Sequence, residues 1–140
     1  DQMASLMGGR AAEEEFFGKD NITTGASNDL KVATRLARKM VTEYGMSDKL
    51  GPQTYGHKEE MPFLGKDYAE HRNYSEKVAD LIDDEVSNLI QEAKETAKKI
   101  IDKDKPTIEK IAETLLKKET IDESEFNKFF VSKKEDKKEK

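Results

Sequence analysis

The 140-residue sequence contains no cysteine and no tryptophan, and only three prolines and two histidines. Without cysteine, disulfides, thiolate metal sites and a cysteine nucleophile are excluded. With two histidines, a His-rich metal site formed by this chain alone is nearly excluded as well. No apolar run reaches the roughly 18 residues of a membrane-spanning helix, and no signal peptide is visible. We therefore do not expect this chain to cross a membrane by itself.

Hydrophobic residues are also scarce. They make up 34% of the chain, against about 45–50% in ordinary domains, while charged residues make up 39%, against about a quarter. This balance disfavours a compact all-β core and favours amphipathic helices with solvated outer faces. The net charge of −5 argues against non-specific nucleic-acid binding.

Apolar residues recur at three- and four-residue steps along most of the chain, which predicts an all-α fold. We expect a bundle of about five helices. They cover about residues 2–17, 27–43 and 75–102, a segment around 108–116, and a short last helix from Asp122. Ser75 and Asp122 are predicted caps, Gly18 and Gly45 predicted stops, and residues 104–106 a predicted helix–helix connection.

Two segments do not follow the helical pattern. Residues 45–73 hold most of the remaining glycines and two prolines, and a minor β-hairpin or irregular segment is predicted near residues 53–65. Residues 132–140 are rich in lysine and glutamate, and we expect a disordered tail there. The predicted folded region therefore covers residues 1–131.

The chain opens inside a helical pattern with no methionine at position 1, which suggests a piece of a longer protein. The alternatives are that Met3-Ala4-Ser5 derives from an expression vector, or that this is a natural N-terminal helix. Gly8 and Gly9 fall within this first helix. Each costs about 1 kcal/mol relative to alanine there. Their presence indicates either close approach by another backbone or a break in the helix.

The sequence lacks the common motifs from which a single chain forms a catalytic site. The sequence has no His-Glu-x-x-His, no Gly-x-x-x-x-Gly-Lys-Ser/Thr and no Gly-x-Ser-x-Gly. His57 and His71 lie in the irregular region without helical spacing, so we expect ordinary surface or structural roles for them rather than a metal pair.

Asp29 is the acid of most interest. It falls in the first turn of a predicted helix, where free N–H groups favour an ionised carboxylate. Such a carboxylate can ligate a metal ion, or it can simply favour the helix start. Glu13, Glu14 and Glu15 form a second acidic cluster, of which at most one or two can point inward. The basic residues of the second helix form a solvated stripe or pair with acids elsewhere; they are Lys31, Arg35, Arg38 and Lys39.

Several blocks resemble the FtsH family of membrane-anchored, hexameric, ATP-dependent zinc metalloproteases. The blocks are Gly8-Gly9-Arg10-Ala11-Ala12-Glu13-Glu14, Thr23-Thr24-Gly25-Ala26-Ser27-Asn28-Asp29-Leu30, Ala33-Thr34, Ala37-Arg38, Met40-Val41-Thr42, Gly45-Met46-Ser47-Asp48-Lys49-Leu50-Gly51-Pro52 and Glu119-Thr120-Ile121-Asp122. The resemblance covers about residues 1–131, and it indicates the C-terminal part of the peptidase domain.

The resemblance implies a role for Asp29 as the third protein ligand of a catalytic Zn2+. The other two ligands are histidines of a His-Glu-x-x-His motif whose glutamate is the general base, and this motif is expected upstream. Glu13 matches a family glutamate that could be suspected as an alternative ligand. We prefer Asp29 and assign Glu13 a supporting or structural role.

The same resemblance implies an ATP-dependent zinc metalloendopeptidase that degrades membrane and soluble proteins. The chain itself is expected to be inactive because it lacks His-Glu-x-x-His. The ATP/Mg2+ site, the membrane segments and part of the homo-hexamer are expected outside it, with this domain on the cytoplasmic side of a bacterial membrane or in an organellar matrix or stroma. The alternative is a helical oligomerisation or interaction module of a degenerate, non-proteolytic homologue.

Overall fold

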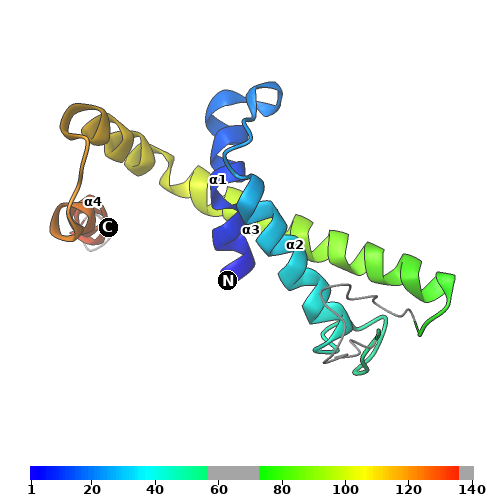
Figure 1. Ribbon diagram of the computed structural model, residues 1–140. Coiled ribbons are helices and arrows are strands. Elements are labelled where there is room, and N and C mark those ends of the chain that lie inside the picture. Colours follow the sequence, from blue (N-terminus) through cyan, green and yellow to red (C-terminus); the bar gives the residue numbers. More distant parts are fainter. Residues whose placement is uncertain (57–72, 136–140) are drawn as a thin grey trace, which may run out of the picture. The chain divides into compact units, whose positions relative to one another are not determined.

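The structure is a computed structural model, and it describes residues 1–56 and 73–135 (Figure 1). The helices are α1 (Gln2–Phe17), the 3-10 helix η1 (Lys19–Asn21), α2 (Ser27–Thr42), α3 (Glu76–Lys118) and α4 (Glu123–Glu135). These described residues contain no strand, so the predicted all-α class is confirmed. No helix among them is long and apolar enough to span a membrane.

The predicted connection at residues 104–106 is wrong, because α3 continues through Pro106. The described part of the chain therefore has four α-helices instead of about five. Proline cannot donate a hydrogen bond to the carbonyl of Asp102, four residues earlier. Both residues are exposed, so water can satisfy that carbonyl, and the flanking residues are mostly good helix formers.

The predicted boundaries of the other helices hold closely. Ser75 caps α3, with its Oγ 3.4 Å from the Val78 nitrogen. Gly18 ends α1 at φ 81°, and Gly45 follows α2 at φ 61°. After Gly18, Lys19–Asn21 form the single turn of η1.

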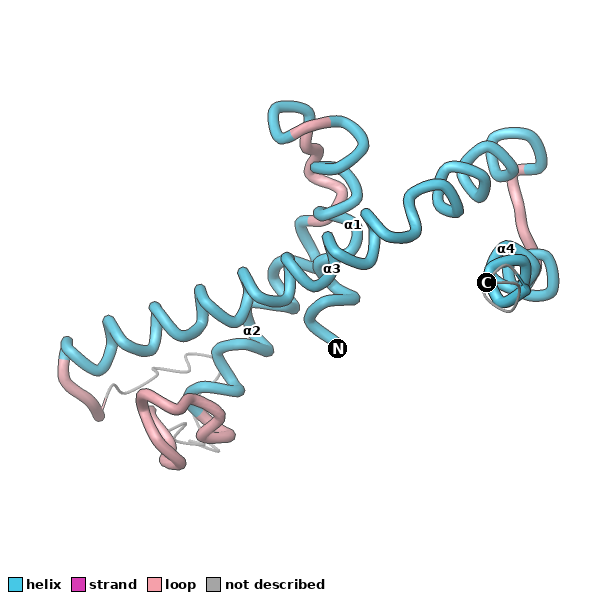
Figure 2. The backbone as a smooth tube through the Cα atoms, turned by 180° about the vertical axis from the view of Figure 1, so that it is seen from behind, coloured by secondary structure: helices cyan, strands magenta, loops and turns pink. Residues whose placement is uncertain are grey.

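The chain divides into two compact units, residues 1–98 and residues 99–140, with the boundary inside α3. Helices α2 and α3 lie side by side in the first unit (Figure 2). Their apolar faces meet in a small core that also takes in one loop residue. The core residues are Ala37, Val41, Leu50, Ile82 and Val86.

The buried row of α3 contains Ile101 and not Ile100. The side chain of Ile100 is 56% exposed, whereas Ile101 is buried. Four residues turn an α-helix by about 400°, which is about 40° more than one full turn. Three residues turn it by about 300°, which is about 60° less than a full turn, so the fourth residue lies closer to the same face. From buried Ala97, the next seam position is therefore Ile101.

Gly8 and Gly9 do not break α1, which runs through both. A Cβ atom built on either would meet no other atom within 4 Å in the described structure. The close approach of another backbone, expected from sequence, is thus not seen among the described residues.

The second unit is helical, but it buries few side chains. Asp122 caps α4 as predicted, because its Oδ1 accepts a hydrogen bond from the Glu125 nitrogen at 2.8 Å. The rings of Phe126 and Phe130 lie 5.3 Å apart.

Two predicted irregular segments fall partly outside the described residues. Helix α4 extends to Glu135, four residues into the segment predicted to be disordered, and residues 136–140 are not described. Residues 53–56 are irregular, and the rest of the predicted hairpin near residues 53–65 lies outside the described part.

Candidate functional site

Asp29 lies in the first turn of α2, as predicted. Its side chain is half-buried, and no hydrogen bond or ion pair engages it within residues 1–56 and 73–135. The positive end of the helix dipole favours its ionised form. Leu36 and Met40 lie seven and eleven residues further on, so they share a face of α2 with Asp29. Both are only half-buried.

Glu13 holds the segment that leads into α2. Its Oε2 accepts a hydrogen bond from the Thr23 nitrogen at 2.9 Å, and its Oε1 accepts one from the Thr23 hydroxyl at 2.5 Å. These bonds, first that from the Thr23 hydroxyl and then that from its backbone, lower the pKa of Glu13 below its ordinary value. A single carboxylate thus ties α1 to the start of the polar block that ends at Asp29.

Gly25 completes this clamp. Its nitrogen donates to Thr23 Oγ1 at 3.1 Å. A Cβ atom at Gly25 would lie 3.2 Å from Thr23 Oγ1 and 3.5 Å from Glu13 Oε1, so a side chain there would crowd the clamp. The turn continues with a hydrogen bond from the Ser27 nitrogen to the Thr24 carbonyl at 3.0 Å. The backbone before Asp29 is therefore fixed by successive bonds.

The two other glutamates of the acidic cluster engage α3. Glu14 Oε2 lies 2.7 Å from Lys94 Nζ, and its Oε1 lies 3.4 Å from Arg10 Nε. The hydrogen bond from Lys94 is the main cause that lowers the pKa of Glu14. Glu15 lies 3.9 Å from Lys98. Each of the three neighbouring glutamates thus has a different partner.

A second polar anchor holds the loop after α2, and sequence reasoning did not find it. Glu85 of α3 accepts a hydrogen bond from the Ser47 hydroxyl at 2.8 Å and lies 2.7 Å from Lys49 Nζ. Lys49 first, and then Ser47, lowers the pKa of Glu85. A glutamate flanking an apolar seam was the available signal. This anchor fixes the C-terminal end of α2 as the Glu13 clamp fixes its start.

The described residues do not form a complete metal site. No group of three histidine, cysteine, aspartate or glutamate side chains gathers among residues 1–56 and 73–135. His57 and His71 lie outside the described residues. What this part of the chain offers is one carboxylate, Asp29, on a braced helix start.

Fold and site together define a helical protein in which residues 1–56 and 73–135 present an unengaged carboxylate at a braced helix start and form no complete metal centre. Residues 1–129 match peptidase family M41. The chain belongs to this family, and the resemblance to FtsH proteins is confirmed.

Curated relatives agree with this assignment. The chain is 47% identical over 124 residues to "ATP-dependent zinc metalloprotease FtsH 3" of Synechocystis, an alignment that covers 89% of this chain and 20% of that protein. It is 50% identical over 129 residues to "ATP-dependent zinc metalloprotease FtsH 1" of Thermomicrobium roseum, covering 92% and 20%. It is 52% identical over 121 residues to "ATP-dependent zinc metalloprotease FtsH" of Acidobacterium capsulatum, covering 86% and 18%. The chain thus spans about a fifth of the length of these relatives.

Proposed function

We propose that this chain is the C-terminal helical part of the peptidase domain of an ATP-dependent zinc metalloendopeptidase. In this proposal, Asp29 supplies the third protein ligand of the catalytic zinc. The observation that carries the proposal is the place of Asp29: an unengaged carboxylate in the first turn of α2, within a family M41 chain.

The chemistry of the donor fits zinc as one ligand of several. Zn2+ accepts carboxylate oxygen alongside imidazole nitrogen, and catalytic zinc sites hold three protein ligands. When bound, zinc supplies a Lewis acid and a water whose pKa is lowered to about 7. The chain's own contribution is to present an ionised carboxylate at a fixed position. The two histidines and the general base come from a His-Glu-x-x-His motif of the intact protein.

Glu13 has the supporting role in this proposal. Both of its carboxylate oxygens already accept hydrogen bonds from Thr23. A zinc ion at Glu13 would have to share these oxygens with Thr23, whereas both carboxylate oxygens of Asp29 are unengaged among the described residues. Glu13 is therefore a positioning residue, and it acts through Thr23 on the backbone that leads to Asp29.

The isolated chain is proposed to be inactive. One carboxylate does not hold zinc tightly, and the described residues supply no group of three ligands. Purified chain should show no peptide hydrolysis that depends on added zinc. Metal-dependent turnover that a chelator abolishes would contradict this.

The remaining proposals concern the intact protein. We propose that it assembles as a homo-hexamer and uses ATP and Mg2+ in a separate ATPase domain. It is proposed to degrade membrane and soluble proteins while anchored in a membrane through segments outside this chain, with this domain on the cytoplasmic side. The names of the relatives, ATP-dependent zinc metalloproteases, support the ATP dependence, the zinc and the protein substrates.

The direct test is to sequence the parental reading frame over about 100 codons upstream of Asp1, which is within the usual length of one domain. A His-Glu-x-x-His there would complete the set of ligands with Asp29. A frame in which those positions are replaced would overturn the catalytic proposal. It would leave the alternative, a helical oligomerisation or interaction module without proteolytic activity.

A further inference from the structure

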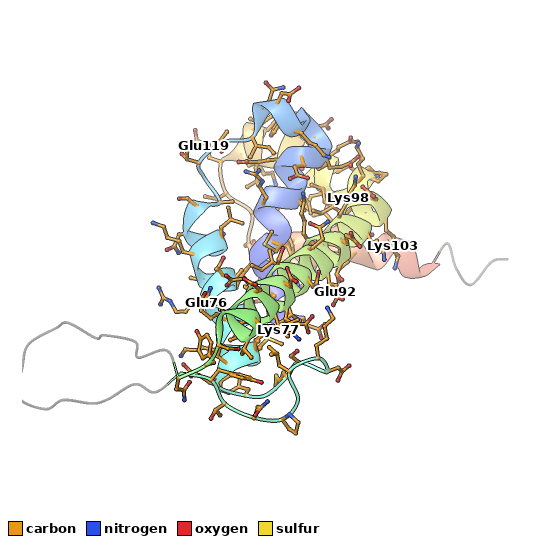
Figure 3. All side chains as sticks on the ribbon, turned by 90° about the vertical axis from the view of Figure 1, so that its right-hand side faces the viewer. Glu76, Lys77, Glu92, Lys98, Lys103 and Glu119 are labelled. Atoms are coloured by element: carbon orange, nitrogen blue, oxygen red, sulfur yellow. The ribbon has the colours of Figure 1, made fainter. Side chains whose placement is uncertain are left out.

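Lys94 joins α3 to α1 beside the clamp at Glu13. Its Nζ lies 2.7 Å from Glu14 Oε2, and its side chain is only 25% exposed. One turn further along α3 lies Lys98, which is labelled in Figure 3. Lys98 is 53% exposed and lies 3.9 Å from Glu15, which is too long for a hydrogen bond. The two lysines therefore offer the same charge to the same stretch of α1, but only Lys94 does so through a short, half-buried bond.

The last turns of α1 depend on such polar bonds. The buried side chains of α1 are Met7 and Ala11, and no other is buried before the helix ends at Phe17. Glu13 and Glu14 both lie in this last stretch, and adjacent residues point about 100° apart around a helix. They can therefore reach two different neighbours, the polar block before α2 through Glu13 and α3 through Glu14. The C-terminal half of α1 is thus a link between α3 and the backbone that enters α2.

Loss of the Lys94 ammonium would loosen this link. Glu14 would keep only its contact with Arg10, 3.4 Å away, and that contact ties α1 to itself. The last turns of α1 would then be held less firmly against α3, and Glu13 would shift with them because a helix moves as a rigid element. The hydrogen bonds between Glu13 and Thr23 would carry this shift to the segment that leads into α2. Rigid helices and chains of hydrogen bonds are the usual carriers of such coupling.

We propose that Lys94 is a positioning residue for the Asp29 carboxylate. Its bond is to Glu14, and it acts from α3 through the last turns of α1. The clamp at Glu13 passes this effect to the backbone before Asp29. The inference rests on the proposed role of Asp29 as a zinc ligand, and it adds a residue of a distant helix to the support of that ligand.

The first measurement is amide hydrogen exchange in the 140-residue chain, followed by NMR. Lys94→Met removes the charge and keeps the helix propensity of the side chain. We expect the Thr23 and Gly25 amides, which donate hydrogen bonds of the clamp, to exchange about threefold faster or more. Lys98→Met makes the same change in charge and should leave both rates unchanged. Lys94→Arg keeps the cation and should keep the original rates.

The second measurement is the zinc affinity of the intact protein, determined by competition with a chelator. Lys94→Met should weaken zinc binding about threefold to tenfold, which is less than the loss expected for a residue bonded directly to a ligand. Lys98→Met and Lys94→Arg should bind zinc as the original protein does. Circular dichroism and thermal unfolding check that each variant is folded when zinc is measured. A residue that contributes to stability alone would not change the zinc affinity of the folded protein.

A double-mutant cycle tests the route from Lys94 to Asp29. Glu13→Ala removes the clamp, so Lys94→Met should cause no further loss of zinc affinity in that background. In the original background the same substitution should have its full effect. Additive effects of the two substitutions would show that Lys94 does not act through Glu13, and they would overturn the inference.

Failure of this inference and failure of the proposed zinc ligand are distinguishable. If Asp29→Asn binds zinc as the original protein does, the proposed ligand is wrong and the inference is overturned with it. If Asp29→Asn loses zinc affinity while Lys94→Met changes neither zinc affinity nor amide exchange, the ligand stands and only the inference is overturned. Equal effects of Lys94→Met and Lys98→Met would also overturn it, because they would reflect net charge and not the bond to Glu14.

Discussion

The two units of this chain contain similar helical patterns with different outcomes. Residues 1–98 bury the apolar rows of α2 and α3 in a common core. In residues 99–140, apolar side chains at equally good helical spacing remain largely exposed. They include Leu115 at 41%, Leu116 at 86%, Phe126 at 45% and Phe130 at 40% exposure, whereas Ile101 is buried.

Polar anchoring differs in the same way. The first unit brackets α2 with two anchors that join separate elements, the exposed Glu13 clamp and the half-buried Glu85 anchor. The second unit has the Asp122 cap and the exposed pair of Lys118 and Glu125. The comparison teaches that helical spacing predicts the helix, whereas stability depends on what covers its apolar row.

The largest expected effect comes from shortening one apolar side chain in each unit and comparing the losses of stability. Ile82→Ala should lower the free energy of unfolding by about 2–5 kcal/mol, because it leaves a cavity at a fully buried position. Leu116→Ala should change it by less than about 0.5 kcal/mol, since the side chain is already in water. Denaturant unfolding followed by circular dichroism measures both; equal losses would contradict the division.

A second prediction concerns the loop that closes the first unit. Gly45→Ala should cost about 2–4 kcal/mol, because φ is 61° and the new Cβ would lie 3.0 Å from the Pro52 Cα. Gly51→Ala is the matched control: φ is 76°, but nothing lies within 4 Å, so only the backbone strain of about 1–2 kcal/mol remains. If both variants unfold at the same denaturant concentration, the close approach at Gly45 has no energetic consequence.

The Glu85 anchor should give the first unit a pH dependence. Lys49 and Ser47 lower the pKa of Glu85 in the folded state below its ordinary 4.5. Its contribution is therefore complete above about pH 4.5 and is lost as the pH falls through the lowered pKa. Glu85→Gln should cost about 1 kcal/mol at pH 7 and should reduce the loss of stability on acidification. Asp83→Asn, at the exposed pair with Arg38, is the control and should cost less than about 0.5 kcal/mol. If the loss of stability on acidification is the same in Glu85→Gln as in the original chain, other carboxylates dominate that loss.

The smallest expected effect comes from a substitution in the second unit that should stabilise it. Glu119 follows α3 at φ 64°, a conformation that favours glycine. Glu119→Gly should stabilise the helix end by about 0.5–1 kcal/mol, whereas Glu119→Ala keeps the strain and should be near neutral. Thermal unfolding followed at 222 nm compares the two. A destabilised glycine variant would mean that the Glu119 side chain contributes more than the strain costs.

Much of the fold could be predicted from the sequence because its signals are local. Caps such as Ser75 and Asp122, and the glycine stops, depend on residues within one turn. Pro106 misled the prediction, since proline usually marks a helix start, and only the exposure of this stretch shows why the helix can continue. The burial of Ile101 rather than Ile100 is local as well, because it follows from the four-residue step after Ala97.

The site was predictable in part for the same reason. The place of Asp29 in a first turn follows from local spacing. The clamp between Glu13 and Thr23 joins residues ten apart, and the Glu85 anchor joins residues 38 apart, so neither could be read from local pattern. Whether Asp29 binds zinc stays a prediction.

Zinc analysis of the intact protein tests the central claim most directly. Zinc content per chain would be measured by elemental analysis after dialysis, for the parent and for Asp29→Asn, Glu13→Gln and the control Asp20→Asn. We predict stoichiometric zinc in the parent, the control and Glu13→Gln, and about a tenfold or greater loss of zinc affinity in Asp29→Asn. Zinc retained in Asp29→Asn but lost in Glu13→Gln would contradict the account, because it would make Glu13 the ligand and Asp29 an acid that only favours the start of α2.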